Sequence, residues 1–209
     1  MKKLISLISV GVLFMSCAKD DNVAVISTKF GDMVVEFYPE VAPMHVESFQ
    51  ILAEEGYFDG TTFHRVIPGF VIQGGDPNSK DNDRMNDGTG GRAGKYFGIG
   101  REDDPDSWLI PGEFNDSLHV KGTLSMARTR DPNSASSQFF ICHGPVPSLD
   151  KQYTVFGQVI EGLDIIDNIV NVNRPKKENP MYQGPDGDNP YEKVEMSVKI
   201  MKRSEALAD

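Results

Sequence analysis

Residues 63–76 read Phe63-His64-Arg65-Val66-Ile67-Pro68-Gly69-Phe70-Val71-Ile72-Gln73-Gly74-Gly75-Asp76, and this stretch decides the fold. A related pattern follows later in the chain, in Ser125-Met126-Ala127-Arg128 and Ser136-Ser137-Gln138-Phe139-Phe140-Ile141. These stretches combine strand-forming apolar residues with arginine and glutamine. They bring no nucleophile with its base, no proton-transferring pair and no cluster of metal ligands. A cation beside an apolar pocket suits a reaction that breaks no covalent bond.

The chain as a whole predicts short strands joined by turns, together with two helices. Strands are expected at residues 23–30, 33–38, 63–67, 70–74, 123–127, 138–142, 154–160 and 195–201. Residues 43–55 and 163–170 carry apolar residues at helical spacing, and Gly56 ends the first of these helices. Gly31-Asp32 is expected to form the two-residue turn of the first hairpin. Many short strands favour a closed antiparallel barrel or a sandwich, and two helices could fill the ends of a barrel.

The N-terminal residues are typical of an exported lipoprotein. Lys2 and Lys3 precede the twelve-residue apolar run Leu4–Met15, which is too short to span a bilayer comfortably and resembles the core of a secretory signal. Ser16-Cys17 follows, as at a bacterial lipoprotein cleavage site, although an ordinary signal peptide with an incidental cysteine is the alternative. We therefore expect a signal peptide at 1–16, a lipidated tether at 17–22, one domain at 23–203 and a tail at 204–209.

Lipid on Cys17 would hold the protein in the bacterial cell envelope, on the periplasmic face of the outer membrane or at the cell surface. Lys19-Asp20-Asp21 resembles a surface-export signal, and a short solvated tether explains it equally well. Cys142, the other of the two cysteines, lies in an apolar strand and is expected to be buried and unreactive. The formal net charge of −10 argues against nucleic acid and anionic membrane surfaces as partners.

Residues 63–76 and 125–141 closely resemble the signature segments of the cyclophilin-type peptidyl-prolyl cis-trans isomerases, and the resemblance runs from about Val23 to about Ile200. It implies a mainly β fold, an eight-stranded closed antiparallel barrel capped by two α-helices. It also implies an isomerase that accelerates X-Pro bond rotation in exported or envelope proteins, without covalent chemistry, cofactor or metal. Its implied partners are proline-containing polypeptides, and we expect a monomer. The alternative is a proline-binding chaperone or surface interaction module with little turnover.

The resemblance also implies the residues of the site. Arg65 would stabilise the twisted amide, Gln73 would support Arg65, and Phe140 would form the floor of the proline pocket. The backbone of Arg128 would pair with the residue before proline, in the manner of an added strand. His64 is expected to be a hydrogen-bonded structural histidine. The substrate-binding residues that the resemblance implies are His64, Phe70, Val71, Met126, Ala127, Arg128, Gln138, Leu149 and Tyr153.

Strand alternation separates two neighbouring phenylalanines, because successive side chains point to opposite faces. We expect Phe140 to line the groove and Phe139 to fill the barrel. Two other positions depart from the family pattern, because Ser148 and Tyr153 stand where eukaryotic members carry tryptophan and histidine. Since Ser148 offers neither an aromatic wall nor an indole N–H, we expect weak binding of cyclosporin.

The remaining signals are weak. Residues 77–87, 101–110 and 173–191 are polar and look like insertions without an assignable role. Residues 88–93 imitate a dinucleotide-binding fingerprint, but no strand precedes them, so they are interpreted as a turn. His45, His119 and His143 lie apart without the spacing of metal ligands, which argues against a metal site.

Overall fold

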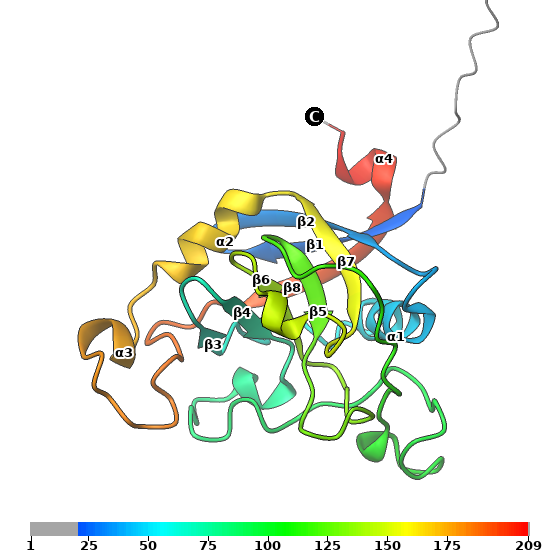
Figure 1. Ribbon diagram of the computed structural model, residues 1–209, viewed down its shortest axis with the longest axis horizontal. Coiled ribbons are helices and arrows are strands. Elements are labelled where there is room, and N and C mark those ends of the chain that lie inside the picture. The colour runs from blue at the N-terminus through cyan, green and yellow to red at the C-terminus, as the bar shows by residue number, and fades with distance from the viewer. Residues whose placement is uncertain (1–20, 209) are drawn as a thin grey trace, which may run out of the picture.

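The computed structural model describes residues 21–208, so the predictions for Cys17, for the signal peptide and for most of the tether lie outside the described residues. Eight strands form one sheet in the order β3-β4-β6-β5-β7-β2-β1-β8, and all of the pairings between them are antiparallel (Figure 1). The strands are β1 (Asn22–Thr28), β2 (Gly31–Phe37), β3 (Arg65–Val66), β4 (Val71–Gly74), β5 (Thr123–Met126), β6 (Phe139–Cys142), β7 (Val155–Glu161) and β8 (Met196–Lys202).

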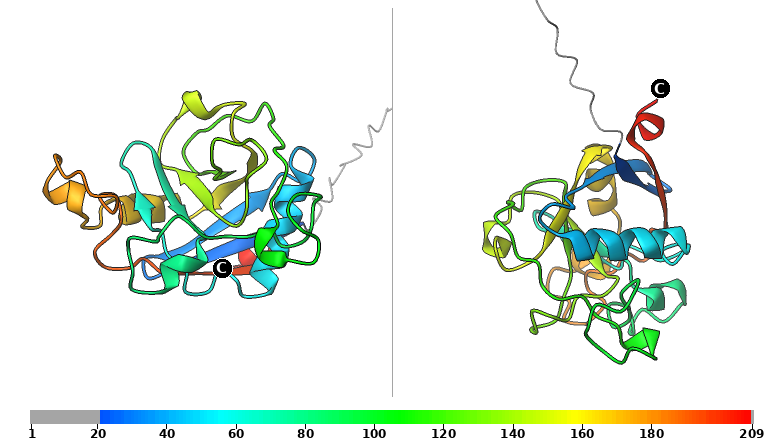
Figure 2. Two further views of the ribbon diagram at one scale, coloured as in Figure 1. Left: turned by 90° about the horizontal axis from the view of Figure 1, so that it is seen from below. Right: turned by 90° about the vertical axis from the view of Figure 1, so that its right-hand side faces the viewer.

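The sheet curls into a half-barrel around the main core, as Figure 2 shows. Its edge strands β3 and β8 share no ladder in the described chain. An isolated bridge between Thr62 and Glu195 joins the segments just before them, and the Phe63 N–H donates to the Val194 carbonyl at 3.0 Å. The eight antiparallel strands are therefore confirmed. The closed barrel expected from the sequence is not formed by strand pairing, because only this short contact joins the two edges of the sheet within residues 21–208. The two-residue β3 is too short to pair along β8.

Two of the insertions cover the outer edge of β3. The Val66 N–H donates to the Asp188 carbonyl at 2.8 Å, so residues 173–191 occupy positions that a further strand would fill. Residues 77–87 pack on the same segment, because Arg84 Nη2 donates to the Asn189 carbonyl at 2.6 Å and Asn189 Nδ2 donates to Asp87 Oδ2 at 2.5 Å. The insertions thus bind each other and protect an exposed sheet edge.

Two longer helices lie at opposite ends of the sheet (Figures 1 and 2). They are α1 (Pro43–Glu54), which begins at a proline as helices commonly do, and α2 (Leu163–Val170). Both bury apolar faces in the main core, including Phe49 of α1 and Ile166 of α2. Their bounds agree with the sequence prediction to within one residue. None of the described helices is long and apolar enough to cross a bilayer.

Five short elements escaped the sequence analysis. They are η1 (Pro77–Lys80), η2 (Pro105–Ser107), η3 (Pro147–Leu149), α3 (Pro175–Glu178) and α4 (Arg203–Ala206). None exceeds four residues, so none shows a helical period in the sequence. Helix α4 crosses the expected boundary between domain and tail. The Arg203 N–H donates to the Asp21 carbonyl at 3.0 Å, so the two ends of the described chain lie side by side.

The first hairpin turns earlier than predicted. Lys29-Phe30 form its two-residue loop, and Gly31 pairs with Thr28 as the first residue of β2. Thr28 Oγ1 accepts a hydrogen bond from the Phe30 N–H and donates to the Gly31 carbonyl, both at 3.1 Å. Gly31 has φ +123°, and a Cβ there would lie 2.9 Å from Cδ1 of Ile165. The positive φ favours glycine at this position, since the tip of the Ile165 side chain could shift, whereas the sequence pattern indicates a turn residue.

Candidate active site

One row of paired residues crosses four strands of the sheet. Arg65 pairs with Gln73, Gln73 pairs with Phe140, and Phe140 pairs with Ser125. Directly opposed residues project from the same face, so strand pairing alone aligns a cation, an amide and an aromatic ring. The neighbouring row projects to the other face and is buried in the main core; it consists of Ile72, Ile141 and Leu124.

The first row opens onto a small pocket with a volume of about 170 Å³. That volume is below the roughly 300–1,000 Å³ typical of sites for drug-sized ligands, so the pocket suits one side chain rather than a cofactor. None of its lining residues is a carboxylate, an imidazole or a thiol. The lining residues are Arg65, Phe70, Val71, Gln73, Ala127, Arg128, Phe140, Leu149 and Tyr153, all of which the sequence analysis had predicted as site residues.

A chain of three hydrogen bonds orients Arg65. Its Nη1 donates to Gln73 Oε1 at 3.1 Å, Gln73 Nε2 donates to Gln138 Oε1 at 3.0 Å, and Gln138 Nε2 donates to the Gly90 carbonyl at 2.7 Å. A Cβ at Gly90 would lie 2.6 Å from Asp76 Oδ1, so the glycine lets this loop approach closely. Each glutamine uses both ends of its amide, and the chain therefore fixes the orientation of the guanidinium.

The positive charge of Arg65 has no ionic partner in residues 21–208. No carboxylate in residues 21–208 lies within ion-pair distance of its guanidinium. Burial lowers the pKa of Arg65 below its ordinary value, and Asp188 and Tyr153 act in the opposite direction. The guanidinium still stays charged at neutral pH, because arginine does not deprotonate in proteins. Its Cζ lies 5.6 Å from the centroid of the Phe70 ring.

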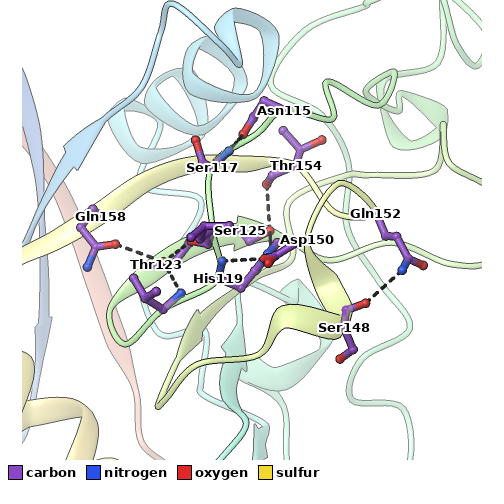
Figure 3. A network of polar contacts seen from close by, with 12 residues as sticks. Asn115, Ser117, His119, Thr123, Ser125, Ser148, Asp150, Gln152, Thr154 and Gln158 are labelled. Atoms are coloured by element: carbon purple, nitrogen blue, oxygen red, sulfur yellow. Dashed lines mark hydrogen bonds and ion pairs between the residues drawn. The ribbon is translucent and has the colours of Figure 1, made fainter.

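A polar network that includes His119, Asp150 and Ser125 (Figure 3) supports Phe140, the floor of the pocket. The His119 ring stacks on Phe140 with centroids 5.9 Å apart, and its Nδ1 and Nε2 lie 3.0 Å from Asp150 Oδ1 and 3.1 Å from Ser125 Oγ. Because Asp150 can only accept, Nδ1 carries a proton. The Ser125 hydroxyl donates to the Thr154 carbonyl at 2.9 Å, and its oxygen lies against Nε2. Burial lowers the pKa of His119, and the hydrogen bond to Asp150 offsets part of this effect. Burial therefore favours the neutral form of the ring in the folded protein.

Nothing in the sequence pattern predicts this support. His119 stands alone among the histidines of the sequence, and no motif marks Ser125 or Asp150. His119 and Asp150 are 31 residues apart in the chain, so no local pattern links them. The backbone bond from the His119 N–H to Asp150 Oδ1, at 2.8 Å, also depends on tertiary structure.

The far wall of the pocket is built from Tyr153 and Arg128. The Tyr153 ring meets Phe140 edge-on, with centroids 5.8 Å apart and an interplanar angle of 77°. Arg128 Cζ lies 4.4 Å from the centroid of the Tyr153 ring. The backbone N–H and carbonyl of Arg128 make no backbone hydrogen bond within residues 21–208, so this wall carries an unpaired strand-like edge.

Three predicted site residues lie outside the pocket. Met126 is 2% exposed and packs in the main core, because alternation sends its neighbour Ser125 to the pocket side. Gln138 lies behind Gln73 and acts on Arg65 only through it. His64 is buried, and neither of its ring nitrogens forms a well-aligned hydrogen bond in the described chain. Burial lowers the pKa of His64, although the Thr62 backbone lies close enough to act in the opposite direction and raise it.

The alternation of the two phenylalanines is confirmed. Phe139 is fully buried in the main core and meets the Phe49 ring edge-on, with centroids 5.4 Å apart. Phe140 belongs to a second, smaller cluster with Val71 and Cys142 beneath the pocket. The prediction for Cys142 is also confirmed, because it is buried and burial raises the pKa of its thiol to about 12.

A larger hollow of about 960 Å³ lies elsewhere on the molecule. It is lined by polar and apolar residues of several elements, among them Glu36, Glu40, Leu118 and Lys202. It contains no arginine, and its charged lining residues are mostly acidic. The smaller pocket is the candidate active site, because of the two pockets only this one brings an oriented cation and a hydrophobic floor together.

Comparisons with known proteins agree with this geometry. The sequence model of the family described as cyclophilin type peptidyl-prolyl cis-trans isomerase/CLD matches residues 23–185. A probable peptidyl-prolyl cis-trans isomerase of Brucella abortus (strain 2308) is 38% identical over 180 residues, which cover 86% of each chain. The chain belongs to the cyclophilin-type peptidyl-prolyl cis-trans isomerase family.

Other cyclophilin relatives extend the match in sequence and in structure. A peptidyl-prolyl cis-trans isomerase of Synechococcus elongatus is 40% identical over 153 residues, covering 72% of this chain and 90% of the relative. The crystal structure of a Cryptosporidium parvum cyclophilin, obtained in the presence of the dipeptide Ala-Pro, superposes with a TM-score of 0.69 and 27% identity. It covers 86% of this chain and 98% of the other. This cyclophilin is therefore a peptidyl-prolyl cis-trans isomerase with the cyclophilin fold.

Proposed function

We propose that this cyclophilin accelerates rotation about X-Pro bonds through electrostatic stabilisation of the twisted amide by Arg65. One observation carries the proposal. A half-buried cation, without a carboxylate partner among the described residues, is held beside an apolar pocket. The described lining of that pocket offers no carboxylate, imidazole or thiol for covalent or proton-transfer chemistry. The hydrogen bond from Arg65 Nη1 to Gln73 leaves other N–H groups of the guanidinium available to a substrate.

The chemistry of the amide explains why a fixed cation is useful. Rotation about the peptide bond breaks its resonance and has a barrier of about 18–20 kcal/mol. In the twisted state the prolyl nitrogen becomes pyramidal and holds a localised lone pair. A donor directed at that nitrogen interacts more strongly with the twisted state than with the planar one, and only such a difference lowers the barrier.

The required stabilisation indicates that Arg65 acts together with the pocket. An acceleration of about 10⁵-fold corresponds to roughly 7 kcal/mol of barrier reduction. Removing one charge-directing donor from an enzyme site typically costs about 3–4 kcal/mol, so the guanidinium accounts for about half of that amount. We assign the remainder to clamping of the proline ring on Phe140 and Leu149 and of the flanking backbone.

The unpaired edge at Arg128 supplies a place for that backbone. An extended substrate could pair with the N–H and carbonyl of Arg128 in the manner of an added strand. Main-chain pairing is independent of the substrate's side chains, so it holds many sequences in the same register. The proline ring would then enter the pocket beside Arg65.

We further propose that the substrates are exported or envelope proteins. Support comes from the sequence order at the N-terminus, where two lysines, a twelve-residue apolar run and Ser16-Cys17 precede a charged tether. Lipid on Cys17 would hold the isomerase at the outer membrane. Replacing Cys17 by alanine should then move the protein from the membrane fraction to the soluble fraction. Degradation of the wild type by external protease on intact cells would distinguish surface display from a periplasmic position.

The activity is tested by following cis-trans exchange of a short Xaa-Pro peptide with the wild-type protein. Uncatalysed exchange takes tens to hundreds of seconds, so catalysis at micromolar enzyme is directly visible. Acceleration that scales with enzyme concentration is the expected result. Peptide binding without acceleration would contradict it and would favour a proline-binding chaperone or surface interaction module.

A further inference from the structure

A second cation, Arg128, lines the pocket, and it too lacks an ionic partner in the part of the chain that the structure describes. Arg65 and Arg128 both face the pocket, and neither meets a carboxylate within ion-pair distance in residues 21–208. Carboxylates are not scarce, because the chain has 31 acidic and 21 basic residues. Four other arginines do pair with acids: Arg84 with Asp186, Arg92 with Glu55, Arg101 with Asp104, and Arg203 with Glu36.

The guanidinium of Arg128 is held in place by neutral groups. Its Nε and Nη2 donate to the Gln152 carbonyl at 3.1 Å and 2.8 Å, and its Nη1 donates to the Thr129 carbonyl at 2.8 Å. The rings of Tyr153 and Phe114 flank it, with centroids 4.4 Å and 5.6 Å from Cζ. These contacts fix the side chain without neutralising its charge. A ligand that pairs with it would therefore lose less conformational entropy than with a free side chain.

The side chain also keeps a donor for a ligand. A guanidinium carries five N–H groups, two of them on Nη2. Only one acceptor, the Gln152 carbonyl, is present for the Nη2 of Arg128 in the described chain. The second Nη2 N–H is therefore available for a charge-assisted hydrogen bond to a carboxylate.

We propose that Arg128 determines substrate specificity, so that the enzyme prefers X-Pro segments with an acidic residue next to the proline. The proposal rests on the proposed function, in which the Arg128 backbone pairs with the chain beside the proline. The net charge of −10 would repel an acidic peptide at long range, but charges are screened over about 8–10 Å at physiological ionic strength. Within that distance the pocket itself presents two arginines and no acid.

Matched peptides test this specificity. We would measure kcat/KM by exchange NMR, without a coupling protease, on peptides with Glu, Gln or Lys directly before or directly after one proline. For the wild type, kcat/KM of the peptide with Glu at one of these positions should exceed that of the Gln peptide by about threefold to fivefold, which corresponds to the free energy of an exposed ion pair. The kcat/KM of the Lys peptide should be lower than that of the Gln peptide. In Arg128→Gln the ratio of Glu to Gln should fall to about one.

Two further variants make the result specific. Arg130→Gln changes the net charge as much as Arg128→Gln does, at an exposed arginine two residues away. The ratio of kcat/KM for the Glu and Gln peptides should therefore stay at the wild-type value in this variant. Arg128→Lys keeps the charge without the planar fork and should give an intermediate ratio. Circular dichroism melting of each variant shows whether it is folded.

The same peptides distinguish a wrong specificity proposal from a wrong proposed function. Equal rates for Glu and Gln peptides in an active wild type would overturn the role of Arg128 alone, as would a preference that survives in Arg128→Gln. Absence of catalysis on every peptide would overturn the proposed function. In that case titration of the same peptides, followed by NMR, still decides whether Glu binds more tightly than Gln and whether Arg128→Gln removes the difference.

Discussion

Arg65 and Gln73 occupy directly paired positions of β3 and β4, and the Arg65 guanidinium donates to the Gln73 side-chain oxygen at 3.1 Å. The backbone register therefore brings the cation and its support together before any side-chain packing is considered. The register also makes Phe140 the next member of the row, so the pocket floor lies beside the pair. The register of the sheet thus sets the relative positions of the three residues of the candidate site.

Removing the support of Arg65 should slow catalysis more than it weakens binding. In Gln73→Leu the guanidinium loses an acceptor that orients it, and we expect kcat/KM to fall about tenfold, corresponding to about 1.4 kcal/mol, mainly through kcat. Gln138→Leu lies one hydrogen bond further from Arg65 and should cost less. Steady-state kinetics of both variants, with melting curves as a control for folding, check the order. A larger loss in Gln138→Leu would contradict a role that passes through Gln73.

The neighbouring phenylalanines should separate stability from catalysis. Phe139→Ala removes a fully buried core ring and should lower the free energy of unfolding by about 3–5 kcal/mol. Phe140→Ala removes the pocket floor, and we expect a larger loss of kcat/KM with a smaller loss of stability. Urea unfolding and the isomerase assay on both variants provide the measurement. The opposite pairing of effects would show that the strand register is inverted.

Buried neutral histidines should make the fold sensitive to mild acid. Burial lowers the pKa of both His64 and His119 in the folded protein, so the unfolded chain binds more protons below about pH 6.5. Their stabilising contribution is full above that pH and is lost as the pH falls towards the folded-state values. We expect the free energy of unfolding to decrease between pH 7 and 5. His119→Asn should flatten this decrease, and an unchanged slope would contradict a neutral His119.

Cyclosporin should bind weakly. Ser148 is exposed in η3, next to Leu149 of the pocket, and it offers neither an indole N–H nor an aromatic wall. Ser148→Trp should therefore strengthen binding, as measured by calorimetric titration. Nanomolar binding by the wild type would show that the assignment of residues around Leu149 is wrong.

Periodicity and long motifs account for what could be predicted from the sequence. Alternation placed Phe139 and Phe140 on opposite faces, and apolar spacing located α1 and α2 to within one residue. Seven of the nine residues that line the pocket belong to residues 63–76 and 125–141, the segments that resemble cyclophilins most closely, and Leu149 and Tyr153 lie in the nearby stretch that departs from the family pattern. These features are local, or they follow from the pairing of recognisable strands.

What could not be predicted depends on contacts between distant segments. Gly31-Asp32 indicates a turn, but Gly31 is the first residue of β2 and has a positive φ, which depends on the register of the hairpin. The support of Phe140 by His119 joins residues that share no motif. The insertions appeared to lack a role because the edge of β3, which residues 173–191 cover, is not defined until the sheet forms.

The central claim, that Arg65 stabilises the twisted amide, is tested most directly by the catalytic rate of Arg65→Ala. The matched control is Arg130→Ala, which removes an exposed arginine outside the pocket. We predict that kcat/KM on a neutral Xaa-Pro peptide falls by about two to three decades in Arg65→Ala, or about 3–4 kcal/mol of transition-state stabilisation, with the fold intact. The control should retain wild-type kcat/KM. A loss of less than about threefold in a folded Arg65→Ala would contradict the mechanism.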